Sequence, residues 1–162
     1  MRYSANWGSH IPILVKVMNL SQGPVLELGM GLFSTPLLHW LCLEQKRQMV
    51  SYDNSLEWVK MNKTFESPIH RILYTQTADW ESAGADRHWG LALVDHHPGI
   101  RRGIDAIRLK DKADYVVVHD SDLLTEYGYE NIYQHFKYSY DWKRRKPWTT
   151  VLSNFYSLEG LR

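Results

Sequence analysis

The sequence predicts an α/β domain whose mostly parallel β-sheet is covered by helices on both faces. Residues 25–28, 89–94 and 115–118 form short, nearly continuous apolar runs. Strands buried on both faces have this pattern, whereas half-exposed strands alternate apolar and polar residues. Helical patterns separate the runs at near-regular intervals, which is typical of repeated strand–helix units. The chain of 162 residues is long enough for one substantial core, so we treat residues 1–162 as one domain.

The predicted elements follow one another in a regular order. Five segments have strand character: residues 25–28, 48–52, 71–74, 89–94 and 115–118. Three segments have helical character: residues 10–20, 35–43 and 54–65. Ile100, Ile104 and Ile107 follow the fourth strand at near-helical spacing. The tail differs, because residues 136–142 and 148–155 flank a basic turn and predict an antiparallel hairpin.

Two of the predicted helices carry start signals. Ser34 or Thr35 is a candidate N-cap for the helix at 35–43, and Pro36 is tolerated in its first turn. The sequence Asn-Ser-Leu-Glu at residues 54–57 resembles a capping box, with Asn54 as the cap.

Composition excludes several classes of protein. Hydrophobic residues make up 44% of the chain, and the formal net charge of +1 gives no overall attraction to nucleic acid or acidic lipid. Cys42 is the single cysteine, so no internal disulfide forms, and its apolar neighbours predict a buried thiol. No signal peptide is recognisable, and no apolar run approaches the ~20 residues of a membrane span. We therefore expect a cytoplasmic protein that does not associate with membranes.

The residues after the strands predict a ligand site. Ligands of open parallel sheets bind beyond the carboxyl ends of the strands. Gly29 and Gly31 follow the first strand in the sequence GPVLELGMGLFSTP, and these glycines allow backbone to approach a ligand closely. Aspartates follow each of the other four strands: Asp53, Asp79, Asp95 and Asp120.

The glycine turn favours a nucleotide-like ligand other than a dinucleotide. A dinucleotide fingerprint needs a third glycine where Ser34 stands. Asp53 is placed to accept hydrogen bonds from both hydroxyls of a ribose. Glu27, inside the first strand, suits an amino or cationic group near the turn. Asp79 and Trp80 suit an adenine, with the ring packed on the base.

These motifs in this order resemble those of class I S-adenosylmethionine-dependent methyltransferases. The resemblance covers residues 23–122, and the terminal hairpin is similar to the last two strands of that fold. It implies a three-layer Rossmann-like sandwich with a seven-stranded sheet and S-adenosyl-L-methionine as cofactor. It places Glu27, Gly29 and Gly31 around the methionine part, Asp53 at the ribose and Asp79 at the adenine. The complete set expected at the cofactor is Glu27, Gly29, Gly31, Ser34, Asp53, Asn54, Asp79, Trp80 and Asp95.

A second set of residues resembles the catechol-type O-methyltransferase branch of that family. Its members are Asp95-His96-His97 and Asp120-Ser121, together with Phe33-Ser34. The branch holds Mg²⁺ with two aspartates and an asparagine, which implies Asp95 and Asp120 as metal ligands here. Ser121 replaces the asparagine, for which Asp122 or His119 could substitute, and Pro98 replaces the lysine base. Without a metal, His96, His97 or His119 could be the general base.

We therefore expect Asp95, His96, His97 and Asp120 to carry catalysis on an oxygen or nitrogen atom of a small-molecule acceptor. Residues 2–10 are expected to fold over the pocket. A non-catalytic cofactor- or partner-binding domain and an NAD-dependent enzyme remain alternatives, and a homodimer is left open. The basic turn at residues 143–146 also admits RNA. We favour a solvated turn and no nucleic-acid partner, because the net charge is close to zero.

Overall fold

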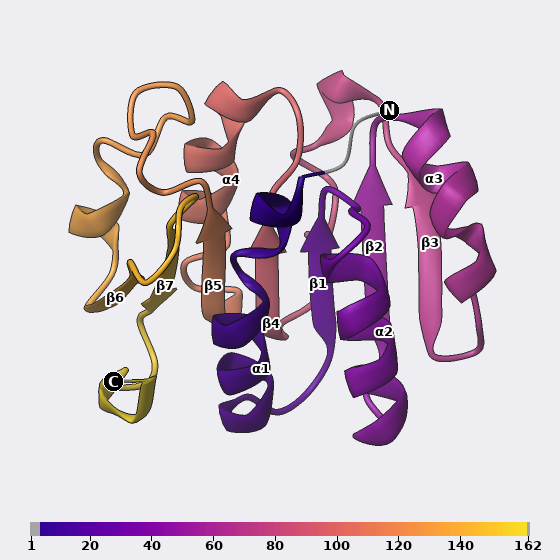
Figure 1. Ribbon diagram of the computed structural model, residues 1–162, viewed down its shortest axis with the longest axis horizontal. Helices are drawn as coiled ribbons and strands as arrows, with labels where there is room; N and C mark the ends of the chain where they lie inside the picture. Colours follow the sequence, from indigo (N-terminus) through magenta and orange to yellow (C-terminus); the bar gives the residue numbers. More distant parts are fainter. Residues whose placement is uncertain (1–3, 162) are drawn as a thin grey trace.

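A seven-stranded sheet forms the centre of the computed structural model, which describes residues 4–161 (Figure 1). The strand order is β3-β2-β1-β4-β5-β7-β6. Strands β1 to β5 run parallel, whereas β7 pairs antiparallel with β5 and β6. The strands are β1 Val25–Leu28, β2 Met49–Asp53, β3 His70–Tyr74, β4 Trp89–Val94, β5 Ala113–His119, β6 Tyr138–Trp142 and β7 Thr149–Ser153. The predicted parallel sheet with its terminal hairpin is confirmed.

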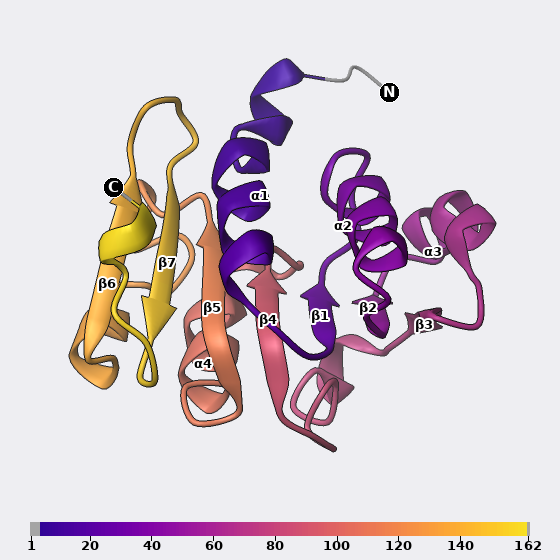
Figure 2. The ribbon, with the colours of Figure 1, turned by 90° about the horizontal axis from the view of Figure 1, so that it is seen from below.

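Helices cover both faces of the sheet, so the molecule has three layers. Figure 2 shows α1 and α2 on one face and α4 on the other. The α-helices within residues 4–161 are α1 Ile11–Leu20, α2 Ser34–Glu44, α3 Leu56–Asn62 and α4 Arg102–Arg108. The central strands send alternate side chains into the two interfaces. Leu26 and Leu28 pack on the α4 side, whereas Val25 packs on the side of α1 and α2.

The helix starts differ in detail from the sequence-based expectation. Neither Ser34 nor Thr35 caps α2, because this helix begins after Phe33 without a side-chain cap. The Thr35 hydroxyl instead accepts a hydrogen bond from the Gly31 N–H. Ser55, rather than Asn54, caps α3 by accepting from the N–H of Trp58. This α-helix ends at Asn62, and a 3-10 turn over Lys63–Phe65 completes the predicted segment.

The expected burial of Cys42 is confirmed. Cys42 is fully buried, and burial raises the pKa of its thiol to about 12. Ile100 and Ile104 are both 60% exposed, and Ile100 lies in the 3-10 turn Gly99–Arg101 that precedes α4. Helix α4 buries the smaller Ala106 against the sheet instead. Among the described residues, none of the helices combines the length and apolarity that a membrane crossing needs.

The carboxyl ends of the parallel strands share one edge of the sheet, at the top of Figure 1. There β1 lies between β2 and β4. The chain runs from β1 to β2 and β3 on one side of β1, and then crosses to β4 on its other side. Ligands of open α/β sheets bind at such a switch point. A short turn at Ala5–Gly8 precedes α1 and lies on the α1 and α2 side of the sheet (Figures 1 and 2).

Candidate functional site

Two adjoining cavities open at the carboxyl edge of the sheet. The first, of about 370 Å³, is lined by the β1–α2 turn, the ends of β4 and β5, and residues of the N-terminal segment. The second, also of about 370 Å³, lies beside the end of β2 and the loop after β4. They share four lining residues: Met30, Trp58, Asp95 and Arg102. Each volume is in the range of small-molecule sites.

The glycine turn is closely packed against the loop after β4. Gly29 has φ +94°, and a Cβ there would lie 2.5 Å from backbone atoms of Asp95 and His96. Two N–H groups of the turn have partners inside the protein. Met30 donates to Asp53 Oδ2 at 2.7 Å, and Gly31 donates to Thr35 Oγ1 at 3.0 Å. Side chains from β2 and α2 therefore already accept hydrogen bonds from these two N–H groups.

Asp53 lies at the predicted place, at the end of β2 and in the wall of the second cavity. Its Oδ1 accepts from the N–H of Ser55 at 2.7 Å. Burial raises the pKa of this carboxyl, although backbone hydrogen bonds oppose the shift. A carboxylate has about four acceptor positions, so Asp53 keeps acceptor capacity beyond its two backbone bonds. Asn54 lines the same cavity and donates to Thr77 Oγ1 at 2.8 Å.

Glu27 lines neither cavity, and its expected place beside the cofactor stays a prediction. Its side chain is fully buried between β1, β2 and α2. Thr35 Oγ1 donates to one carboxyl oxygen at 3.0 Å, and Ser51 Oγ donates to the other at 2.6 Å. Burial raises the pKa of Glu27 to about 7. The residue therefore braces the glycine turn from inside the sheet.

The sequence reasoning missed the polar neighbours of Glu27. His70 Nε2 lies 2.8 Å from Ser51 Oγ, and His70 Nδ1 lies 3.1 Å from Nδ1 of His39. Burial and the nearby His39 lower the pKa of His70 to about 4. The two histidines lie on β3 and α2, and only the tertiary structure brings them together.

Asp79 and Trp80 line neither cavity, and their expected place at the adenine stays a prediction. Asp79 ends an exposed 3-10 turn, Thr77–Asp79. Trp80 is fully buried, and its Nε1 donates to the carbonyl of His97 at 3.0 Å. Its ring stacks on that of His96, with centroids 4.2 Å apart. The large apolar ring enters the core and supports the loop after β4.

A cluster of charged side chains forms the floor shared by the two cavities. Arg102 Nη1 lies 2.8 Å from Asp95 Oδ1 and 2.7 Å from Asp120 Oδ2. The guanidinium also donates to the carbonyl of His96 at 2.7 Å and stands 4.3 Å from the ring centroid of Tyr127. Asp95 and Asp120 thus meet as predicted, but they meet around an arginine.

Magnesium does not fit between these two aspartates. A Mg²⁺ ion on both carboxylates would have to displace Arg102, and it requires near-octahedral oxygen ligands. Asp122, considered as a substitute ligand, accepts from the N–H of Trp148 at 2.8 Å and lies 3.4 Å from Lys146 Nζ. The sequence analysis did not identify Arg102 as a site residue. Its position at the start of the helix after Asp95 was the available signal.

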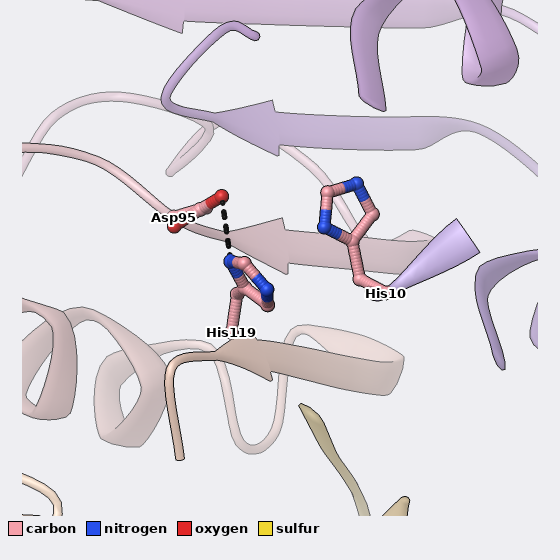
Figure 3. Close-up of side chains that lie close together, drawn as sticks. All are labelled: His10, Asp95 and His119. Atoms are coloured by element: carbon pink, nitrogen blue, oxygen red, sulfur yellow. Dashed lines mark ion pairs between the residues drawn. The ribbon is translucent and has the colours of Figure 1, made fainter. Parts of the chain in front are cut away.

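The histidines near the rim have different environments. The His96 side chain is completely buried between Trp80 and Asp105, with Nε2 2.9 Å from Asp105 Oδ2, and His96 is among the residues that line the second cavity. His97 is exposed and lines the second cavity. His119 and His10 line the first cavity together with Asp95 (Figure 3). His10 was not recognised from the sequence as a site residue.

Charges in the cluster shift one another's pKa values. Burial opposes ionisation of Asp95, yet His119 and Arg102 hold its pKa well below the usual range. Burial also opposes the charged form of His119, yet Asp95 and Asp120 raise its pKa above the ordinary value. Burial and the neighbouring His119 lower the pKa of His10 to about 4.

The basic turn of the terminal hairpin is largely engaged by its own neighbours. Lys143 Nζ lies 3.0 Å from Asp141 Oδ2 and 4.8 Å from the ring centroid of Trp148. The Arg144 guanidinium lies 4.9 Å from the ring centroid of Trp142. These contacts agree with a solvated turn, and the absence of a nucleic-acid partner stays a prediction.

Comparison with known proteins identifies the fold. No protein-family model and no curated protein matches the sequence. Among solved structures, a Staphylococcus aureus protein assigned as a caffeoyl-CoA O-methyltransferase matches with a TM-score of 0.65 and 9% identity. The human methyltransferase 10 domain containing protein matches with a TM-score of 0.62 and 11% identity. Each match covers 93% of this chain and 84% of the other chain. The chain therefore has the class I S-adenosylmethionine-dependent methyltransferase fold.

Proposed function

We propose that this protein transfers the methyl group of S-adenosylmethionine to an oxygen or nitrogen atom of a small molecule. The proposal rests mainly on the two adjoining cavities at the switch point of the sheet. The glycine turn lines both of them, and Asp53 lines the second. The methyltransferase fold makes S-adenosylmethionine the cofactor to test first.

The residues of the second cavity suit the nucleoside part of that cofactor. Asp53 retains acceptor positions for ribose hydroxyls, and Asn54 lies next to it. Trp58 offers an aromatic wall to both cavities. Gly31 and Ser34, in the first cavity, would contact the methionine part. Glu27, Asp79 and Trp80 have no part in this proposal, because their side chains lie elsewhere.

The first cavity suits the acceptor. Trp7, Phe33 and Tyr127 give it aromatic walls, while His10 and His119 give it a polar side. S-adenosylmethionine supplies an already activated methyl group, so the protein mainly has to hold the acceptor in line with it. Magnesium is left out of the proposal, because Arg102 binds the two carboxylates that were expected to hold it.

Calorimetry with S-adenosylmethionine, S-adenosylhomocysteine and NAD tests the cofactor assignment. We expect one equivalent of either adenosyl ligand to bind and NAD to bind more weakly. Trp58→Ala should weaken binding by about tenfold, since loss of an aromatic wall at a base costs about 1–3 kcal/mol. Trp40→Ala is the matched control, because Trp40 is 58% exposed on α2 and lines neither cavity. Absence of binding at saturating ligand, or a preference for NAD, would contradict the assignment.

A non-catalytic cofactor-binding domain is the second candidate. It is favoured by the ion pairs at the rim, where Asp95, Asp120 and His119 already pair with one another or with Arg102. Release of S-adenosylhomocysteine in the presence of phenols, catechols or amines separates the two candidates. Turnover with any of these acceptors supports the transferase, and cofactor binding without turnover supports the binding domain.

A further inference from the structure

Three side chains from distant parts of the chain converge at the first cavity (Figure 3). His10 precedes α1, Asp95 follows β4, and His119 ends β5. A nitrogen of each histidine and a carboxylate oxygen of Asp95 all lie within 4.8 Å of one another. We propose that these residues bind one divalent metal ion, such as Zn²⁺, that accepts imidazole ligands. The inference is independent of the proposed function, because it concerns metal binding without cofactor or acceptor.

His10 is the first support for this site. It is 2% exposed, and neither ring nitrogen has a hydrogen-bond partner among the described residues. A buried polar group without a partner costs about 1–3 kcal/mol. Its ring lies edge-on to that of His119, with centroids 4.7 Å apart, and borders the same cavity. A metal ion in the cluster would give His10 the partner that it lacks.

His119 is already oriented as a metal ligand. Its Nε2 lies 3.0 Å from Ser9 Oγ, and Ser9 Oγ donates to the carbonyl of Pro147 at 2.6 Å. The hydroxyl has one hydrogen, which goes to Pro147, so Nε2 must be the donor toward Ser9. Nδ1 is then the nitrogen that faces Asp95, 3.2 Å from its Oδ2. Metal-bound histidines are commonly fixed in this way, by an outer hydrogen bond from the other ring nitrogen.

Asp95 divides its two oxygens between different partners. Oδ1 lies 2.8 Å from Arg102, whereas Oδ2 lies 3.2 Å from Nδ1 of His119. Two ligands of a tetrahedral zinc ion, each bonded at about 2.0–2.2 Å, lie about 3.4 Å apart. The spacing of Oδ2 and Nδ1 is therefore close to that of neighbouring ligands. Arg102 would hold the outer oxygen and fix the carboxylate, which is a common arrangement around bound metals.

Charge and ligand type favour a zinc-like ion over magnesium. Asp95 and Asp120 contribute two negative charges and Arg102 one positive charge, so the cluster with neutral histidines suits a cation. Imidazole nitrogens suit zinc, copper, iron or nickel, whereas magnesium prefers oxygen. Three protein ligands leave a fourth tetrahedral position for water or a ligand, as in open zinc sites. This set retains Asp95 from the expected metal ligands and excludes Asp120.

A proton is the competing occupant, because a protonated Nδ1 of His119 could bridge to Asp95 in the same geometry. Titration of chelator-treated protein with Zn²⁺ by calorimetry and with Co²⁺ by visible absorption distinguishes the two. We expect one equivalent of Zn²⁺, the strong d–d bands of four-coordinate Co²⁺, and no comparable binding of Mg²⁺. Lack of stoichiometric Zn²⁺ and Co²⁺ binding would overturn the metal site and favour the proton as the link between His119 and Asp95.

Variants test each part of the site. His10→Phe keeps a ring in place and should weaken Zn²⁺ binding by more than about 100-fold, while Ser9→Ala should weaken it by about 10–100-fold. His88→Ala is the matched control, since His88 lies 2.8 Å from Asp114 on the surface and should not affect binding. Thermal unfolding in chelator verifies that each variant is folded, and His10→Gln replaces any His10→Phe protein that is not. Unchanged affinity in the folded His10 variant would overturn the proposed site.

Discussion

Glu27 is a carboxylic acid enclosed within the sheet and connected to the glycine turn by hydrogen bonds. Thr35 donates to Glu27 and accepts from the N–H of Gly31, while Ser51 bonds to the other carboxyl oxygen. Because burial disfavours the charged form, the pKa of Glu27 rises from 4.5 to about 7. The folded protein thus binds this proton more tightly than the unfolded chain does.

This shift predicts a pH-dependent effect of Glu27→Gln on stability. The stabilisation from the raised pKa is fully present below about pH 4.5 and is lost as the pH rises through about 7. The neutral amide does not titrate, so relative to wild type the variant should gain on the order of 2–3 kcal/mol between pH 4.5 and pH 8. Urea unfolding of both proteins at the two pH values measures this difference.

The design separates Glu27 from other titrating groups. Asp53 and His70 are present in wild type and variant, so their contributions largely cancel in the comparison. Glu44→Gln is the control, because it makes the same substitution at a carboxyl that is exposed at the end of α2. An equal stability difference between wild type and Glu27→Gln at both pH values would contradict the prediction.

At the scale of elements, the turn between β1 and α2 positions the site. Gly29 has a positive φ and lies against the backbone of the loop after β4. Gly31 lacks this constraint, because the nearest atom to an added Cβ is the rotatable Ser34 Oγ, 3.2 Å away. Two glycines that look equivalent in the sequence therefore have different roles.

The two glycines should respond differently to alanine. A left-handed residue costs about 1–2 kcal/mol, and at Gly29 the added Cβ also meets backbone at 2.5 Å. We expect Gly29→Ala to lower the free energy of unfolding by more than about 2 kcal/mol, and Gly31→Ala by less than about 1 kcal/mol. Urea denaturation of both variants provides the measurement. Equal losses would show that the turn is not held against the neighbouring loop.

At the scale of the whole molecule, the single sheet separates two apolar cores, one on each of its faces. Leu26 on β1 and Leu93 on β4 are both fully buried, but they point to opposite faces. Strands β1 and β4 pair directly, so a loss of packing on either face affects the same central strands. This arrangement favours a single cooperative unfolding unit.

The shared strands predict one unfolding transition for both layers. Leu26→Ala and Leu93→Ala should each cost about 2–5 kcal/mol, the usual range for buried leucines. Circular dichroism and tryptophan fluorescence should give the same urea midpoint in each variant. Two separated midpoints would indicate that the layers unfold independently.

Much of the fold, and the residues at the carboxyl edge of the sheet, could be predicted. Hydrophobic periodicity and the ends of strands are local properties of the sequence. Apolar runs identified the strands, and parallel strands place the residues that follow them at one edge. Gly29, Asp53, Asp95 and Asp120 were found in this way. Directions of side chains were not predictable to the same degree. Trp80 is buried in the core, where its ring stacks on that of His96, a residue distant in the sequence.

The sequence by itself determined the α/β class, the parallel sheet with its antiparallel end, and the edge where a ligand would bind. Hydrophobic periodicity and glycine turns depend on near neighbours, so they can be interpreted without coordinates. Only the tertiary structure decided that Arg102 lies between two aspartates and that His10 joins Asp95 and His119. These contacts join residues far apart in the chain, and packing of the layers sets their distances.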